Sequence, residues 1–284
     1  MRWLVTGASG MLGRDLVEAL RRAGHEVTAS DRDLLDVLDA VAVEAAVPGH
    51  DVVVNCAAWT AVDDAESREP DAFLLNAVAP SLLASAARRH GARLVQVSTD
   101  YVFDGAATAP YDEAHPVAPR SAYGRTKAAG EWAALAGCPD ALVVRTAWLY
   151  GRHGSCFPRT IARVAAERGG LDVVADQQGQ PTWTRDLARV ILDLVAAQAP
   201  AGVYHATSGG STTWYEFARA VVAAAGMDPA IVRPLPADKY VRPAPRPAYS
   251  VLAPAGLERV GVPLVPDWAD RWSEAAAEVL DGIG

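Results

Sequence analysis

The sequence has few cysteines, and no spacing relates them to one another. Cys56, Cys138 and Cys156 are odd in number and lie far apart. This argues against a small secreted protein held by disulfides, which would use an even, closely spaced set. It also argues against a zinc site built from paired cysteines. A reducing compartment, the cytoplasm, is the location that this cysteine usage predicts.

Long hydrophobic runs and excess positive charge are also missing. No apolar stretch approaches the ~20 residues that a helix needs to cross a bilayer, and no signal peptide precedes the first predicted strand. Lysine and arginine number 26 against 34 aspartates and glutamates, which leaves a net charge of −8. We therefore expect no membrane and no nucleic acid as a partner, since nucleic acid requires a basic surface. An anionic ligand would need a locally basic pocket.

Apolar runs that alternate with helical patterns fill the first half of the 284-residue chain. Short, continuously apolar segments are typical of parallel strands that are buried on both faces of a sheet. The alternation predicts an α/β fold with a Rossmann-type doubly wound parallel sheet. The predicted strands are 2–6, 26–29, 51–55, 93–98 and 141–145, and the predicted helices are 11–23, 71–90 and 122–135.

The pattern loosens after Gly151. Helices are still predicted at 157–168 and 185–197 and a strand at 202–206, while the proline-rich segment 234–247 is predicted to be a loop. We therefore predict a Rossmann domain over residues 1–150. Residues 151–284 are predicted to be mainly a smaller C-terminal α/β lobe that binds the substrate, with the chain free to cross back between the two.

Three glycines connect the first predicted strand to the first predicted helix. Gly7, Gly10 and Gly13 have the spacing G-x-x-G-x-x-G, which differs from the G-x-G-x-x-G of standard Rossmann dehydrogenases. Backbone N–H groups at a helix N-terminus bind a pyrophosphate, and side chains would block that approach. An ordinary glycine turn is the alternative. The position after the first strand favours a dinucleotide site, so residues 1–150 are predicted to bind NAD(P).

Two residues of opposite charge end the second predicted strand. Asp31 and Arg32 lie where the adenosine ribose of a dinucleotide is expected. An aspartate there favours a free 2′-hydroxyl, and an arginine favours a 2′-phosphate. The preference between NADH and NADPH is therefore left open by these residues.

Tyr123 and Lys127 are four residues apart and would share a face of a helix capped by Ser121. A free tyrosine has a pKa of about 10, too high for efficient acid–base work at neutral pH. A neighbouring ammonium lowers that pKa. Tyr-x-x-x-Lys is common by chance. Its place after the fourth strand, downstream of the glycine loop, favours an acid–base pair beside the cofactor.

The fourth predicted strand ends in Ser98 and Thr99, followed by Asp100 and Tyr101. Open α/β sheets bind their ligands at the carboxyl ends of the strands. A hydroxyl there can donate a hydrogen bond to a carbonyl oxygen that becomes an alkoxide. Ser98 and Thr99 are both candidates, with capping of the strand end as the alternative.

Taken together, these residues resemble the extended short-chain dehydrogenase/reductases. Six segments are more narrowly similar to the dTDP-4-dehydrorhamnose reductase family, and they follow the family order as far as Ser250. The segments are 55–63 (NCAAWTAVD), 98–103 (STDYVF), 123–127 (YGRTK), 145–150 (RTAWLY), 176–182 (DQQGQPT) and 246–250 (RPAYS).

The resemblance implies a cytoplasmic oxidoreductase that reduces the 4-keto group of a dTDP-linked 6-deoxy sugar with NADPH, NADH being possible. It implies Tyr123 as proton donor, Lys127 as its pKa-lowering partner and ribose ligand, and Thr99 as donor to the carbonyl. The other implied cofactor contacts are Gly7, Gly10, Met11, Leu12, Gly13, Asp31, Arg32, Asp36, Val37, Ala57, Ala58, Trp59 and Thr60. The implied substrate contacts are Thr99, Asp100, Tyr101 and Trp148.

The chain departs from the family pattern at a few positions. Trp59 stands where histidine or tyrosine is usual, and Tyr249 where asparagine is frequent. Some members bind magnesium between subunits through acidic side chains. Asp15 could be one such ligand, but Arg185 stands where another carboxylate is expected, so we predict no metal. A monomer and a homodimer both remain open.

The proline-rich segment supplies the basic pocket that an anion needs. Lys239, Arg242 and Arg246 lie in it, and Asp238 is its one acid between Arg233 and Arg246. Arg242 and Arg246 are therefore predicted to bind the diphosphate of the substrate. A solvated surface loop is the alternative. Trp214 and His205 are interpreted as packing or surface residues.

Three other functions remain as alternatives. The first is a 4-ketoreductase for another dTDP-deoxysugar of secondary metabolism, since rhamnose formation requires the same chemistry. The second is a nucleotide-sugar epimerase or dehydratase, although the acidic pair of the dehydratases is replaced by Asp100-Tyr101. The third is a non-catalytic, NADP-binding regulatory subunit.

Overall fold

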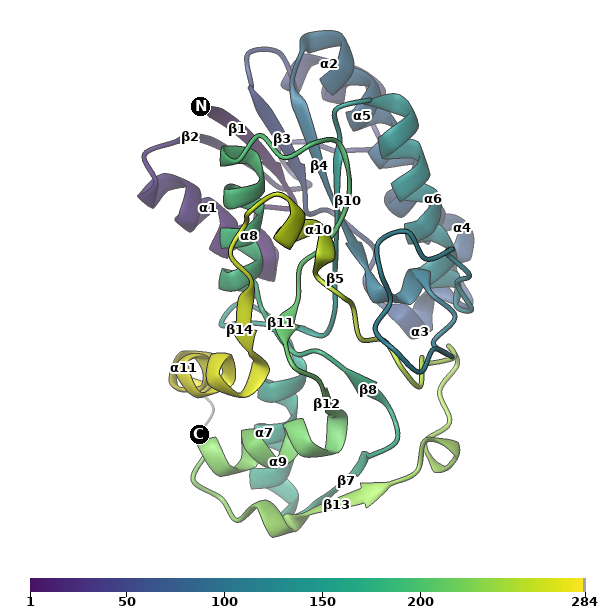
Figure 1. Cartoon of the computed structure of the whole chain (residues 1–284), viewed down its shortest axis with the longest axis vertical. Coiled ribbons are helices and arrows are strands. Elements are labelled where there is room, and N and C mark those ends of the chain that lie inside the picture. The colour runs from purple at the N-terminus through teal and green to yellow at the C-terminus, as the bar shows by residue number, and fades with distance from the viewer. Residues whose placement is uncertain (283–284) are drawn as a thin grey trace.

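A computed structural model describes residues 1–282 and shows a sheet of six parallel strands (Figure 1). The strands lie in the order β10-β5-β4-β3-β1-β2, and all five neighbouring pairs are parallel. This confirms the predicted fold class. The strands are β1 (Arg2–Thr6), β2 (Glu26–Ser30), β3 (Val52–Asn55), β4 (Arg93–Thr99), β5 (Leu142–Thr146) and β10 (Gly202–His205).

The order of the strands determines where ligands can enter. The chain passes from β1 to β2 on one side and then returns to β3 on the other side of β1. The loops that leave β1 and β3 therefore diverge, which opens a crevice at the carboxyl ends of these two strands. Apolar residues in the middle of β1, β3, β4 and β5 are buried because helices cover both faces, whereas those of the edge strand β2 are only half-buried.

Helices cover the two faces of the sheet in separate groups (Figure 1). On one face α1 (Met11–Arg22) packs against α8 (Thr184–Ala196), where Leu16 and Leu20 join Leu187 and Ile191 in one core. The other face carries α2 (Ala40–Ala46), α5 (Ala79–His90) and α6 (Ala122–Gly137). The amphipathic helices α1, α5 and α8 turn their apolar stripes toward the sheet.

The helix predicted over 71–90 is present, but a π-helical turn interrupts it. The structure has α4 (Glu69–Phe73), then a π-helical turn η1 (Leu74–Val78), and then α5. In a regular helix Pro80 could not donate to the Asn76 carbonyl, and its ring would clash with that carbonyl. The wider π-helical turn removes the clash and leaves the carbonyl free of this bond. The Asn76 carbonyl packs against Gly130 of α6, where an added Cβ would lie 2.0 Å from it. The interruption thus lets two helices approach closely.

The second lobe lies beneath the sheet in the view of Figure 1. It has an aromatic core of its own. The fully buried side chains of Tyr150 and Phe217 pack with Trp272, which is 4% exposed. The longer elements of this lobe are α7 (Phe157–Arg168), α9 (Trp214–Ala224), α11 (Trp268–Leu280), β7 (Leu171–Val174) and β13 (Val232–Leu235). The first lobe also has one short helix, α3 (Val62–Ala65). Other short elements of the chain are β6 (Leu149–Tyr150), β8 (Gln178–Gly179), β9 (Thr182–Trp183), β11 (Ser208–Gly209), β12 (Thr212–Thr213), α10 (Ala255–Arg259) and β14 (Val265–Asp267).

The proline-rich segment 234–247 is only partly a loop, which corrects the prediction. Pro234 and Leu235 belong to β13, which pairs with β7 in parallel. A proline is tolerated there because β13 forms the edge of a two-stranded sheet, where a missing N–H costs no ladder bond. Ala237–Lys239 then form a 3₁₀ turn.

The chain crosses back to the first lobe after Gly151. The helix α8 and the strand β10 both follow this residue in sequence, yet they pack on and extend the central sheet. Residues 184–205 therefore complete the sheet from the second half of the chain. Within residues 1–282, no helix is both long and apolar enough to cross a membrane.

Candidate active site

A cleft of ≈650 Å³ opens at the carboxyl ends of the strands. Its walls come from the glycine loop, the segments after β3, β4 and β5, the start of α6, and Trp214 of α9. The structure thus brings together, in one cleft, residues that lie up to two hundred positions apart in sequence. The predicted site residues that line it are Gly7, Gly10, Met11, Leu12, Gly13, Ala58, Thr60, Thr99, Asp100, Tyr101, Tyr123, Lys127 and Trp148.

The glycine loop has the shape of an anion cradle. Gly7 has φ +64°, and a Cβ there would lie 2.6 Å from the Ala57 nitrogen, so only glycine suits this turn. A Cβ on Gly13 would lie 2.3 Å from the Gly7 oxygen. Gly10 is different, because its φ is −72° and an added Cβ meets only the Gly7 oxygen, at 3.2 Å. Its missing side chain leaves open space in front of the helix.

The N-terminus of α1 faces this open space. Among the described residues, no side chain caps the first turn of the helix, so its N–H groups remain available. A phosphate at a helix N-terminus accepts from such groups and is favoured by the helix dipole. The residues present therefore suit the pyrophosphate of a dinucleotide.

The segment after β3 forms the floor beside the glycine loop. Asn76, in the π-turn, accepts a hydrogen bond from the Trp59 nitrogen at 2.8 Å and donates to the Trp59 carbonyl at 3.1 Å. Asn76 also donates to Thr126 Oγ1 on α6 at 3.0 Å. It therefore ties this floor to the helix of Tyr123. Sequence reasoning missed Asn76, because its role depends on the irregular turn.

Some predicted cofactor contacts lie outside the cleft. The Trp59 indole turns away from it and lies under Arg68, whose guanidinium carbon is 4.6 Å from the ring centroid. Ala57 contacts Gly7 through its backbone and lies behind the lining. Val37 is buried in the core, and Asp36 accepts a hydrogen bond from the Leu38 nitrogen at 2.9 Å. A contact of these residues with the cofactor stays a prediction.

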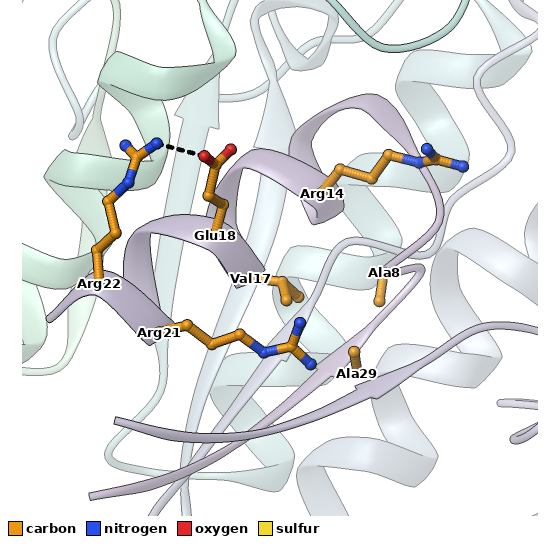
Figure 2. Close-up of a pocket in the computed structure, with 7 residues that line it drawn as sticks. All are labelled: Ala8, Arg14, Val17, Glu18, Arg21, Arg22 and Ala29. Carbon is orange, nitrogen blue, oxygen red and sulfur yellow. Dashed lines mark hydrogen bonds and ion pairs between the residues drawn. The ribbon is translucent and has the colours of Figure 1, made fainter. Parts of the chain in front are cut away.

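Asp31 and Arg32 lie at the end of β2, outside the main cleft. The backbone of the glycine loop reaches this point, because the Ala8 nitrogen donates to the Ser30 carbonyl at 3.0 Å. Nearby, a shallow hollow of ≈540 Å³ lies between α1 and β2 and is lined by Arg14, Arg21 and Arg22 (Figure 2). Arg22 pairs with Glu18 there, while Arg14 Nε donates to the Ser9 carbonyl at 3.0 Å. The hollow beside β2 therefore carries three arginines against one glutamate, Glu18.

Tyr123 and Lys127 lie one turn apart on α6, as their spacing predicts. Ser121 caps this helix, accepting from the Gly124 nitrogen at 3.1 Å, which confirms the predicted N-cap. Lys127 is 4% exposed, and its Nζ donates to the Val97 carbonyl of β4 at 2.7 Å. Burial lowers the pKa of Lys127 to about 8, while Glu131 and Cys56 act in the opposite direction. The lysine is thus a cation at neutral pH.

Burial determines the protonation of Tyr123. It raises the pKa of the phenol to about 12, although Thr99 lowers it. Where the sequence predicts a pKa lowered by Lys127, burial raises the pKa in the protein without ligands, and Lys127 is not among the groups that shift it. A lowering effect of Lys127 when the ligands are bound stays a prediction. Tyr123 carries its proton at neutral pH. That is the state that a proton donor requires.

Thr99 lies opposite Tyr123 at the end of β4. Its hydroxyl donates to Asp100 Oδ1 at 2.9 Å and accepts from the Tyr101 nitrogen at 3.2 Å. Burial raises the pKa of Asp100 to about 6, against the lowering effect of the Ser250 and Thr99 hydroxyls. Asp100 Oδ2 is buried and has no partner among the described residues. A ligand in the cleft could supply that partner.

Trp148 forms the far wall in a strained conformation. It has φ +45°, which is unusual for a residue with a bulky side chain. Its ring stacks on Trp214 at a centroid distance of 3.5 Å and fills the place where a Cβ on Gly179 would lie. Trp214 lines the cleft, so its interpretation as a packing residue was incomplete. The sequence signal for this stacked pair is the presence of two tryptophans, Trp148 and Trp214, but they lie in separate segments.

The two predicted anion-binding arginines meet one carboxylate. Asp63 of α3 accepts from Arg242 Nε and Arg246 Nη1, both at 2.9 Å, and from the Ala244 nitrogen at 3.2 Å. Although burial raises it, these bonds hold the pKa of Asp63 below its usual range. Arg242 and Arg246 also line a hollow of ≈440 Å³, which shares Tyr101 and Trp214 with the main cleft.

Comparison with known proteins gives relatives that match nearly the whole chain. The family model described as "RmlD substrate binding domain" matches residues 1–281. A probable dTDP-4,6-dihydroxy-2-methyloxan-3-one 4-ketoreductase of Streptomyces antibioticus is 52% identical over 99% of this chain and 96% of its own. A dTDP-4-dehydrorhamnose reductase of Streptomyces griseus is 50% identical over 96% of this chain and 92% of its own.

A solved structure is similar over the same extent. The dTDP-4-dehydrorhamnose reductase of Bacillus anthracis, in complex with NADP, superposes with a TM-score of 0.94. The two are 36% identical, and the match covers 98% of this chain and 99% of that one. Fold, cleft and relatives agree: the chain belongs to the RmlD substrate binding domain family and is a dTDP-4-dehydrorhamnose reductase-like oxidoreductase.

Proposed function

We propose that the protein reduces the C4 keto group of a dTDP-4-keto-6-deoxy sugar with NADPH. The single observation that carries this is the meeting of Tyr123, Lys127 and Thr99 beside an uncapped helix N-terminus in one cleft. The protonated phenol is poised to give a proton, and the helix terminus is suited to a dinucleotide. The names of the relatives supply the class of sugar.

In this proposal the bound nicotinamide supplies the hydride that reaches C4 of the sugar. Tyr123 donates its proton to the ketone oxygen as that oxygen becomes an alkoxide. Lys127 stabilises the phenolate that is left and binds the ribose of the cofactor. The Thr99 hydroxyl turns from Asp100 toward the ketone oxygen and stabilises the developing negative charge.

The sugar nucleotide would extend from this centre toward the second lobe. Trp148 and Asp100 are proposed to contact the sugar, and Tyr101 lines both hollows. Arg242 and Arg246 are proposed to bind the diphosphate, because planar guanidinium groups suit its oxygens. Asp63 now satisfies both arginines, so an arriving diphosphate has to compete with this carboxylate.

Two sugar products remain candidates for this reaction. Conversion of dTDP-4-dehydrorhamnose to dTDP-L-rhamnose is the one that we favour. A rarer deoxysugar of secondary metabolism is the second, because the relative with that activity is 52% identical and the rhamnose-type relative 50%. An epimerase or dehydratase is less well supported, since Thr99 is followed by Asp100 and Tyr101 rather than by an acidic pair.

Turnover of a panel of dTDP-4-keto-6-deoxy sugars tests the proposal. We expect stoichiometric oxidation of NADPH, and NMR spectra of the product then give its configuration at C3, C4 and C5. If NADPH were oxidised with no sugar of the panel, the protein would not be a reductase of these sugars. The non-catalytic regulatory subunit would then be the alternative that is left. Tightly bound NAD in the purified protein, with redox-neutral turnover, would instead identify an epimerase or dehydratase.

The preference for NADPH gives a prediction at the end of β2. We expect Arg32→Ala to raise the KM for NADPH about 10-fold, because one charge-assisted hydrogen bond to the 2′-phosphate is lost. The KM for NADH should hardly change. Steady-state kinetics with both cofactors measure the ratio, and Arg22→Ala, which removes an arginine paired with Glu18, is the matched control. An equal rise for both cofactors would refute a contact with the 2′-phosphate.

A further inference from the structure

A buried ion pair lies behind Tyr123 and Lys127. Glu131 of α6 accepts from Arg145 of β5 twice, Nε to Oε1 at 2.8 Å and Nη2 to Oε2 at 2.7 Å. The two side chains are 2% and 4% exposed. Glu131 Oε1 also accepts from the Ser98 hydroxyl at 2.5 Å. Both carboxylate oxygens are therefore satisfied inside the protein.

The network continues to the edge of the sheet. Arg145 Nη1 lies 3.4 Å from Nε2 of His205 on β10, and the other ring nitrogen lies 3.0 Å from the Ala253 carbonyl. Burial lowers the pKa of His205 to about 3, and Arg145 acts in the same direction, so the ring is neutral. A neutral ring that donates to Ala253 can accept from Arg145. The cation of Arg145 is therefore balanced by Glu131 rather than by the histidine.

Stability alone gives no reason for such a pair. Transfer of two charges from water costs free energy that their attraction only partly returns, and apolar replacements of buried pairs are often neutral or stabilising. The pair lies between α6, β4 and β5, where both side chains are closed off from solvent. Its position relative to the cleft is the feature that remains to be explained.

That position links the pair to the acid–base residues. Tyr123, Lys127 and Glu131 succeed one another at intervals of four and so share one face of α6. Ser98 directly precedes Thr99 on β4, and Lys127 donates to Val97 of the same strand. The ion pair therefore fixes the face of the helix that carries Tyr123 against the strand end that carries Thr99.

Glu131 also supplies negative charge near a buried ammonium. The hydrogen bond of Lys127 Nζ goes to a neutral carbonyl. The titratable groups around it are Tyr123 and Glu131 on α6, Cys56 after β3, Asp100 after β4 and Arg145 on β5. Of these, Glu131 is the carboxylate that acts to raise the pKa of Lys127. Without Glu131, less would oppose the lowering of the Lys127 pKa by burial.

We infer that Glu131 is a positioning residue for Lys127: its carboxylate, bound by Arg145 and Ser98, holds the face of α6 that carries Tyr123 and Lys127 and places a negative charge near the ammonium. Only the kinetic consequence of this inference rests on the proposed function. The protonation of Lys127 can be measured without any substrate, so a failure of the proposed function leaves the inference testable.

The sequence makes that measurement simple, because Lys127 and Lys239 are its two lysines. In protein labelled with [¹⁵N]lysine, the side-chain signals of these two residues can be titrated separately. We expect Lys127 of the unmodified protein to titrate near pH 8, as burial predicts. In Glu131→Gln we expect this pKa to fall by about one unit, the size of effect that one nearby opposite charge produces.

A matched control lies on the other side of the same helix. Arg125 of α6 binds Glu69 through two hydrogen bonds of 2.8 and 2.7 Å, but both side chains are exposed. Glu69→Gln makes the same chemical change in the same kind of pair, away from Lys127. It should leave the titration of Lys127 and the pH profile of turnover unchanged.

Turnover should show the same shift. If Lys127 must be charged, kcat falls above its pKa, and Glu131→Gln moves this alkaline limb about one unit toward lower pH. The variant should then lose about 10-fold in kcat at pH 8.5, and much less at pH 6.5, for a one-unit shift. A purely structural defect would lower kcat by the same factor at every pH, and that result would overturn the inference.

A second variant covers the case in which Glu131→Gln does not fold. Glu131→Met combined with Arg145→Met removes both charges, and apolar pairs are tolerated at buried sites. We expect it to fold and to show a lowered pKa of Lys127, by less than in Glu131→Gln because the Arg145 cation is removed as well. An unchanged pKa in a folded variant overturns the inference, and so does failure of both variants to fold, since the pair would then be structural.

Discussion

Tyr123→Phe is expected to lower kcat by about 10²–10⁴-fold, the range that loss of a general acid produces. The phenol is the group in the cleft that carries a proton at neutral pH and faces Thr99, and its pKa of about 12 keeps it protonated. Phenylalanine retains the ring that packs edge to face on Tyr101, at a centroid distance of 5.6 Å. Binding of NADPH should therefore survive while turnover is lost.

The measurement combines cofactor binding, followed by fluorescence, with the rate of NADPH oxidation. Tyr204→Phe is a matched control, because it removes a hydroxyl that donates to the Pro200 carbonyl at 2.7 Å, outside the cleft. It should leave kcat near that of the unmodified protein. Turnover of Tyr123→Phe within an order of magnitude of the unmodified protein would remove this residue from the mechanism.

Lys127→Met is expected to lower kcat about 100-fold and to weaken the binding of NADPH as well. Methionine has nearly the same length and can occupy a site that is 4% exposed, but it carries no charge and no donor. The Val97 carbonyl loses its 2.7 Å bond, and the Tyr123 phenolate loses the cation that would stabilise it. We therefore expect the KM for NADPH to rise and kcat to fall in the same variant.

Lys239→Met is the control for this change, since it affects the other lysine of the sequence, which is exposed and in a 3₁₀ turn. The free energy of unfolding should be similar in both variants, because removal of a buried ammonium relieves a desolvation cost. If Lys127→Met kept full kcat and affinity for NADPH, the lysine would have a packing role only.

The parts of the fold that the sequence predicts are those set by local pattern. Continuous apolar runs predicted the five strands of the first half, and the structure confirms each to within about two residues. The glycine loop and the Tyr123–Lys127 pair have a fixed local spacing that can be recognised in the sequence, and the structure places both in one cleft. Ser121 as the cap of α6 is confirmed for the same reason.

The parts that failed depend on contacts between distant segments. The π-turn at Asn76 arises where a proline and a close approach to Gly130 coincide, which no helical period reveals. The raised pKa of Tyr123 depends on burial, and burial is a property of the assembled cleft. The Trp59 side chain contacts Arg68 and donates to the Ala61 carbonyl, contacts that a pattern of residue types does not reveal. Asp63 forms ion pairs with Arg242 and Arg246, and no pattern in the sequence connects it with these arginines.

The return of the chain to the central sheet has a consequence for synthesis on the ribosome. The outer neighbour of β5 is β10, and the partner of α1 on its face of the sheet is α8, so both come from residues beyond 183. At roughly 5–20 residues per second, several seconds separate the emergence of β5 from that of β10. During this interval the nascent chain exposes an unpaired strand edge and the apolar stripe of α1, which are the features that chaperones and aggregates bind. The N-terminal half begins to fold first, yet it cannot be the half that finishes first.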